Sequence, residues 1–179
     1  TDHGVLKIVC SAENMFFQMR KNIYSEEDYA KGFVTDISKV RRNETSPLVY
    51  HKTLNYGDCI LEKRAAAAAG INEKVFVNTK GQISEGTVSN IFFVRKNMIY
   101  TPQLSCGLLP GILREYIMER FQVTETIIYP DELMYYEECF VTNSLMGVMP
   151  VRQLGNICFP HRAKADEVRE VYEKEKMSL

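Results

Sequence analysis

The chain has 179 residues, of which 45% are hydrophobic and 25% charged, a composition typical of a globular protein that buries a substantial core. The formal net charge of -1, without any cluster of Lys and Arg, gives no support to binding of nucleic acid or of an acidic membrane surface. No apolar run approaches the roughly 20 residues that a membrane-spanning helix needs.

The five cysteines lie far apart and show no CxxC spacing. This spread argues against a zinc site or a disulfide framework and favours free thiols in a reducing, cytoplasmic compartment. We therefore expect no metal centre. The sequence starts without a Met and is already apolar by Val5, so we expect it to be the C-terminal part of a longer protein.

Two strands are predicted near the start of the chain, at Val5–Cys10 and Met15–Met19. The polar, acidic segment after them is interpreted as a linker, and the alternation of Gly32–Val40 predicts a strand that opens a second domain. The expected organisation is an N-terminal remnant, a linker and a C-terminal domain, at residues 1–24, 25–31 and 32–179.

Helices are predicted further along the chain. Five consecutive alanines, the best helix former, precede Gly70 and predict a helix from about Tyr56 to Ala69. Pro110 predicts the start of a helix that runs to about Phe121, and a charged amphipathic pattern predicts another at 163–176. Strands are predicted at 74–78, 83–85, 91–94, 98–101, 123–129, 139–142 and 148–154. Because strands outnumber helices and mostly follow one another in hairpins, we favour an α+β fold over a doubly wound sheet.

Lys52 and Glu85 are the candidate pair for chemistry. A lysine in a desolvated, electropositive site has a lowered pKa and forms an imine with an aldehyde, and a carboxylate keeps a pyridine nitrogen protonated. Taken alone, Lys52 is more simply a solvated lysine and Glu85 an exposed hairpin carboxylate. Gly86 favours a functional Glu85, because glycine lets the backbone approach a ligand closely.

Four separated blocks of sequence resemble the class IV aminotransferases, the fold-type-IV enzymes that use pyridoxal 5'-phosphate. The blocks are 51–55 (HKTLN), 84–92 (SEGTVSNIF), 107–114 (GLLPGILR) and 140–151 (FVTNSLMGVMPV). The family includes branched-chain aminotransferases, D-amino-acid aminotransferases and 4-amino-4-deoxychorismate lyases, and the last two blocks are most similar to the lyases. Each block is weak by itself, but together they follow the family's order and cover most of the chain.

The resemblance implies a role for particular residues. Lys52 would bind the cofactor aldehyde and move protons at the substrate α-carbon, and Glu85 would face the pyridine nitrogen. The cofactor phosphate would lie at a helix start, where free amides favour a dianion. The remaining cofactor contacts implied are Ser89, Asn90, Gly111, Ile112, Leu113, Asn143 and Ser144. Ser89 and Asn90 are equally well explained as residues that hold their turn through local hydrogen bonds.

The resemblance also implies an activity and a partner. We expect a lyase that converts 4-amino-4-deoxychorismate to p-aminobenzoate and pyruvate in the folate pathway, acting on a small-molecule substrate as a homodimer. The alternatives are a branched-chain or D-amino-acid aminotransferase, and a truncated, non-catalytic paralogue. The family's phosphate-binding arginine lies in an N-terminal domain without a counterpart here, so we expect this chain to bind the cofactor weakly.

Overall fold

The computed structural model describes residues 4–176. Residues 1–3 of the expected N-terminal remnant and residues 177–179 of the expected C-terminal domain therefore lie outside the described range. The α-helices in the described range are α1 (Glu26–Lys31), α2 (Gly57–Ala68), α3 (Ile112–Arg120) and α4 (Ala163–Lys176). Short 3-10 helices are η1 (Pro47–Tyr50), η2 (Leu104–Cys106) and η3 (Pro130–Tyr135).

Most of the strands form one mixed sheet, in the order β5-β4-β3-β10-β9-β6-β7-β8, with β11 paired to β10. Their bounds are β3 (Phe33–Arg42), β4 (Glu73–Asn78), β5 (Ile83–Gly86), β6 (Asn90–Arg95), β7 (Met98–Pro102), β8 (Val123–Thr126), β9 (Glu138–Asn143), β10 (Gly147–Leu154) and β11 (Ile157–Cys158). Strand β3 is parallel to β4 and β10, and β7 is parallel to β8, whereas the other neighbours are antiparallel. The mixed sheet with helices packed on it confirms the predicted α+β class.

Side chains alternate along the central strands and build a core on each face of the sheet. On one face, Phe92 and Phe140 stack with ring centroids 4.9 Å apart and pack against α3 and α4. On the other face, Phe93 belongs to a larger cluster that both halves of the sheet supply. That cluster includes Val75, Val77, Ile83, Ile91, Val141, Met149 and Val151. The central strands β6, β9 and β10 are therefore buried on both sides over most of their length.

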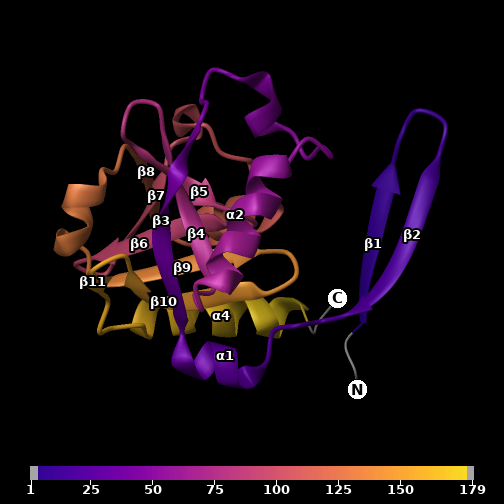
Figure 1. The fold of residues 1–179 in the computed structure, drawn as a ribbon. Helices are drawn as coiled ribbons and strands as arrows, with labels where there is room; N and C mark the ends of the chain where they lie inside the picture. Colours follow the sequence, from indigo (N-terminus) through magenta and orange to yellow (C-terminus); the bar gives the residue numbers. More distant parts are fainter. Residues whose placement is uncertain (1–3, 177–179) are drawn as a thin grey trace.

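The first two strands form a separate hairpin. Strands β1 (Gly4–Cys10) and β2 (Met15–Lys21) are antiparallel and, within the described range, pair only with each other. Figure 1 shows the hairpin standing away from the body of the molecule. Its large apolar side chains are all more than 50% exposed, namely Leu6, Ile8, Met15, Phe16, Phe17 and Met19. This hairpin lacks the apolar cover that the main sheet has.

The segment 25–31, which the sequence analysis interpreted as a linker, contains α1 with Ser25 as its N-cap. The Ser25 hydroxyl accepts a hydrogen bond from the Asp28 N–H, and the Asp28 carboxylate accepts one from the Ser25 N–H, which makes a capping box. The buried Tyr29 hydroxyl then donates to the Met146 carbonyl at 2.5 Å. The acidic residues belong to a helix N-terminus, where they interact favourably with the helix dipole, and that explains the composition.

Smaller differences concern the ends of elements. The helix expected to start at Pro110 begins at Ile112, after the N-cap residue Gly111. The strand expected at 123–129 ends at Thr126, and η3 follows it. Helix α2 ends at Ala68, with Gly70 in the left-handed conformation (φ 70°) that the sequence pattern indicated.

Candidate functional site

Glu85 is a buried carboxylate at the end of β5, with 5% of its surface exposed. Its Oε1 is 2.5 Å from Nη2 of Arg42, and its Oε2 accepts a hydrogen bond of 2.9 Å from the Leu109 N–H. Burial raises the pKa of Glu85 from 4.5 to about 7, although Arg42 and the Leu109 amide favour the charged form. The carboxyl group can therefore exchange a proton near neutral pH.

Arg42 is one of the residues that the sequence analysis missed. It ends β3, and its guanidinium lies 5.3 Å from the Phe76 ring centroid and donates to the Cys59 sulfur at 3.4 Å. These contacts come from β4 and α2 and hold the cation beside Glu85. The sequence offered one signal, namely that a buried carboxylate needs a residue of opposite charge beside it. That requirement does not tell which arginine supplies the charge.

Lys52 lies in the segment between η1 and α2, and its side chain is exposed. The positive charge of Lys52 lowers the pKa of Glu85, as the weakest of the five influences on that group. The structure thus brings the expected pair within electrostatic reach of each other. The nearest anchor of this segment is Tyr50, whose hydroxyl donates to the Glu44 carbonyl at 2.8 Å.

A tight turn follows Glu85. The Gly86 N–H donates to the Ser89 carbonyl at 2.8 Å. A Cβ on Gly86 would lie 2.3 Å from the Ser89 Oγ and 2.5 Å from a Glu73 carboxylate oxygen, so only glycine fits. The Ser89 Oγ is buried and has no hydrogen-bond partner among the described residues. A buried donor of this kind is expected to serve a ligand or a water.

The start of α3 forms an open cradle of backbone. Gly111 is the N-cap residue, and it has no side chain that could accept a hydrogen bond from the first amides of the helix. The first helical hydrogen bond runs from the Glu115 N–H to the Gly111 carbonyl. The amides of Ile112 and Leu113 precede that bond and point out of the helix end. A Cβ on Gly111 would lie only 2.1 Å from the Asn90 Oδ1, so the backbone passes close to that side chain.

Asn90 and Asn143 hydrogen-bond to the backbone of the site loops. Asn90 donates to the Leu109 carbonyl at 2.8 Å, just before the cradle. Asn143 donates to the Val88 carbonyl at 3.1 Å, and its Oδ1 accepts from the backbone N–H groups of residues 145 and 146. Ser144, in the turn between β9 and β10, is exposed. The buried Thr142 Oγ1 has no partner within the described range.

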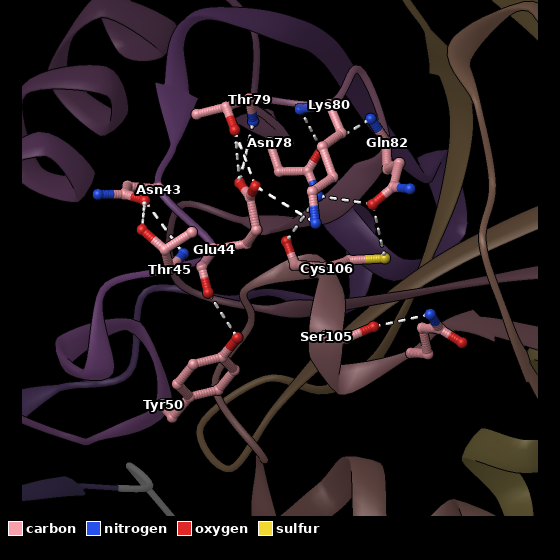
Figure 2. A network of polar contacts seen from close by, with 11 residues as sticks. Asn43, Glu44, Thr45, Tyr50, Asn78, Thr79, Lys80, Gln82, Ser105 and Cys106 are labelled. Carbon is pink, nitrogen blue, oxygen red and sulfur yellow. Dashed lines mark hydrogen bonds and ion pairs between the residues drawn. The ribbon is translucent and has the colours of Figure 1, made fainter.

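A polar network joins the segment before Lys52 to the loop before the cradle (Figure 2). The buried Glu44 accepts from Thr79 Oγ1 at 2.8 Å and lies 3.7 Å from the Lys80 ammonium group. A Cβ on Gly107 would lie 2.7 Å from the Glu44 Cα, so the two backbone segments are in close contact there. Asn78 completes the link by donating to the Cys106 carbonyl at 3.3 Å. The sequence analysis did not find this role of Glu44.

The residues present suit a cofactor that carries a ring nitrogen and an anionic group. Glu85 offers a buried carboxyl group that holds a proton, and the amides of Ile112 and Leu113 favour an anion. The unpartnered hydroxyls of Ser89 and Thr142 supply further hydrogen-bonding groups beside these loops. Arg114 is turned to the Pro102 carbonyl and to Glu125 instead.

The sequence profile of the family described as amino-transferase class IV matches residues 4–154. The chain belongs to the class IV aminotransferase family. Members of this family are enzymes that use pyridoxal 5'-phosphate, and the match begins within the β1–β2 hairpin.

Relatives within the class IV family carry two kinds of name. A Thermotoga maritima protein assigned as a branched-chain-amino-acid aminotransferase is 31% identical over 140 residues, 74% of this chain and 50% of its own. The aminodeoxychorismate lyase of Bacillus subtilis is 28% identical over 126 residues, 68% of this chain and 43% of its own. The chain thus spans about half the length of these curated relatives.

Solved structures of the class IV family agree with this fold. A Legionella pneumophila protein assigned as a 4-amino-4-deoxychorismate lyase superposes with a TM-score of 0.81 and 28% sequence identity. The superposition covers 90% of this chain and 61% of that one.

Two further observations concern other kinds of site. Over residues 4–176, the structure contains no helix that is long and apolar enough to cross a membrane. In the same range, no group of three or more His, Cys, Asp or Glu side chains is arranged to hold a metal ion. The five cysteines are free thiols, three of them buried.

Proposed function

We propose that this chain carries the cofactor-binding part of a pyridoxal-phosphate-dependent 4-amino-4-deoxychorismate lyase. The observation that supports the proposal most strongly is the buried Glu85, clamped between Arg42 and the Leu109 amide with a pKa of about 7. Such a carboxyl group suits a pyridine nitrogen, because the two can share one proton. The cofactor, when bound, supplies an electron-accepting ring, and the protein supplies the charges and the hydrogen bonds around it.

Each of the expected site residues has a part in this proposal. Lys52 would hold the cofactor aldehyde through its amine and would take and return protons at the substrate. Glu85 holds the ring nitrogen protonated. The amides of Ile112 and Leu113, with the backbone at Gly111 and the exposed Ser144 hydroxyl, bind the phosphate. Ser89, Asn90 and Asn143 keep the surrounding loops in place.

The lyase reaction gives p-aminobenzoate and pyruvate from one substrate, with no second substrate to accept the amino group. Similarity to the Bacillus lyase and to the Legionella structure supports this choice, as do the blocks 107–114 and 140–151. A branched-chain aminotransferase is the second candidate, favoured by the 31% identity to the Thermotoga protein. D-amino-acid transamination and a non-catalytic role as a truncated paralogue rank below these two.

We further propose an organisation for the intact protein. Residues 1–24 would belong to an N-terminal domain that covers the β1–β2 hairpin, α1 would join the two parts, and residues 32–179 would form the cofactor-binding domain. The exposed apolar side chains of the hairpin support this proposal. A homodimer in the cytoplasm is the assembly that we expect, as is common for enzymes that bury such surfaces between subunits.

Pyruvate release separates the two activities. The lyase requires 4-amino-4-deoxychorismate alone, so adding an α-keto acid acceptor leaves the rate of pyruvate release unchanged. A branched-chain aminotransferase releases no pyruvate from this substrate, and it converts a branched-chain amino acid to its keto acid only when an α-keto acid acceptor is present. Absence of pyruvate release, together with acceptor-dependent conversion of a branched-chain amino acid, would rule out the lyase.

Cofactor chemistry is tested independently of activity. The chain is incubated with pyridoxal 5'-phosphate, reduced with borohydride and digested, and the labelled peptide is identified by mass spectrometry. We expect label at Lys52 and its loss in Lys52→Ala, whereas the exposed Lys96→Ala keeps it. Label spread over many lysines, with none preferred, would contradict a cofactor site in this chain.

A further inference from the structure

Glu73 is a second buried carboxylate close to the site, outside the four sequence blocks. It begins β4, and its relative exposure is 0%. Its Oε1 accepts hydrogen bonds from the Val88 N–H at 2.8 Å and from the Thr87 hydroxyl at 3.2 Å. Its Oε2 is buried without a hydrogen-bond partner among the residues described. Unlike Glu85, it forms no ion pair within that range.

The groups that Glu73 holds belong to the turn directly after Glu85. The Glu73 carboxylate lies so close to Gly86 that a Cβ there would be 2.5 Å from its Oε1. Val88 is fixed at both of its backbone polar groups, because its N–H donates to Glu73 and its carbonyl accepts from Asn143. From residue 82 to residue 94, Val88 is the exposed exception in an otherwise buried stretch.

A buried carboxylate without a cation is costly, and an apolar side chain of similar size would fill this place at a lower cost. The carboxylate does what an apolar group does not, since it gives the Val88 N–H and the Thr87 hydroxyl an acceptor. Its location inside the turn therefore indicates that the shape of the turn is what this group secures.

We propose that Glu73 is a positioning residue that holds the turn 86–90, and through it Glu85 and Ser89, in the shape that the cofactor requires. The inference rests on the proposed function for the role of the cofactor, but the structural part of it is tested without the cofactor. The reach of the side chain matters in this proposal, and its charge does not.

Two variants separate reach from charge. Glu73→Asp keeps the charge but withdraws the carboxylate from the turn, and Glu73→Gln keeps an oxygen at the same reach. For Glu73→Asp we expect hydrogen exchange at the Val88 amide to become faster by about tenfold or more, with a similar weakening of pyridoxal 5'-phosphate binding. Glu73→Gln should stay within about threefold of wild type in both measurements.

Glu138 provides the matched control. It is 5% exposed, and its carboxylate accepts from the Lys164 and Ala165 amides at the start of α4, far along the chain from the turn. Glu138→Asp should lower the thermal unfolding temperature without changing Val88 exchange or cofactor affinity. If Glu73→Asp does not fold, Thr87→Val removes one of the two hydrogen bonds and should give a smaller change of the same kind.

The outcomes are distinct. Unchanged Val88 exchange in Glu73→Asp overturns the inference, as does an equal loss in Glu73→Gln, which would show that the reach of the side chain is not what holds the turn. Faster exchange with unchanged cofactor affinity overturns the link to the cofactor. If the wild-type chain binds no pyridoxal 5'-phosphate, the proposed function fails, while the exchange measurements still decide whether Glu73 holds the turn.

Discussion

The two halves of the candidate site are held in very different ways. Glu85 is 5% exposed, ion-paired with Arg42 and hydrogen-bonded to the Leu109 amide, and the turn after it is fixed by side chains from other strands. Lys52 is exposed, in a segment whose nearest anchor is the hydrogen bond from Tyr50 to the Glu44 carbonyl. Residues of this sheet hold the Glu85 carboxylate in place, whereas the Lys52 side chain is exposed.

This difference has a physical origin. In the proposed function, the Glu85 carboxylate would face a ring nitrogen and need one geometry in low dielectric, and buried partners provide it. The Lys52 amine would bond to the cofactor and later be released, which requires a side chain that can move, and an exposed segment allows this. Four predictions test the contrast, in order of the expected effect on stability.

Arg42→Ala should have the largest effect, because it leaves the Glu85 carboxylate buried without its cation. We expect a loss of about 3 to 5 kcal/mol in the free energy of unfolding, measured by urea denaturation at pH 8. The loss should be smaller at pH 6, where protonation of Glu85 removes the unpaired charge. Arg41→Ala, at the exposed neighbouring position, should change stability by less than about 0.5 kcal/mol. Equal effects of the two variants would contradict the buried ion pair.

The titration of Glu85 should make stability depend on pH. Its pKa is raised from 4.5 to about 7, so the folded chain binds more protons than the unfolded chain between these values. The free energy of unfolding therefore falls as pH rises through this window, by at most about 3 kcal/mol, and is level above it. The measurement is the difference between wild type and Glu85→Gln in urea at several pH values. A difference that stays constant with pH would contradict the raised pKa.

Gly111→Ala tests the cradle at the start of α3. The added methyl group would lie 2.1 Å from the Asn90 Oδ1, so the helix start or Asn90 must move. We expect a loss of about 1 to 3 kcal/mol in stability, and weaker binding of pyridoxal 5'-phosphate. Gly57→Ala at the start of α2 is the matched control, because no atom lies within 4 Å of its added Cβ. Unchanged cofactor affinity in Gly111→Ala would contradict the proposal that this backbone binds the cofactor phosphate.

Lys52→Ala should have the smallest effect on stability. The side chain is exposed and makes no buried contact, so we expect a change of less than about 0.5 kcal/mol in urea unfolding. A loss of more than about 1 kcal/mol would mean that Lys52 is already packed in place, and the contrast between the two halves of the site would disappear.

The elements predicted most accurately are those with local signals. The hairpin turns, the alanine run before Gly70 and the β-branched strands each depend on neighbouring residues, and most of them lie where the sequence placed them. The helix within the predicted linker at 25–31 was not foreseen, because acidic composition alone does not distinguish an irregular linker from the first turn of a short helix. Its capping box, Ser25 with Asp28, was the signal that distinguishes them.

The candidate site was found from sequence only in part. The four blocks pointed to Lys52, Glu85 and the start of α3, because each block is short and continuous, and the structure brings Lys52 within electrostatic reach of Glu85. The partners Arg42, Glu44 and Glu73 act across the sheet on residues far away in sequence. Arg42 reaches Glu85 over 43 positions and Glu44 reaches Thr79 over 35, so no local pattern connects them. Such pairings become visible only when strand order and register are known.

The parallel pairing of β3 with β10 has a consequence for how the chain folds. Thr35 donates from its hydroxyl to the carbonyl of Gln153, which lies 118 residues further along. During synthesis, β3 leaves the ribosome long before its partner exists and exposes one free edge until most of the chain has been made. Contacts so distant in sequence form slowly, and we expect this edge to be the part of the nascent chain that chaperones protect.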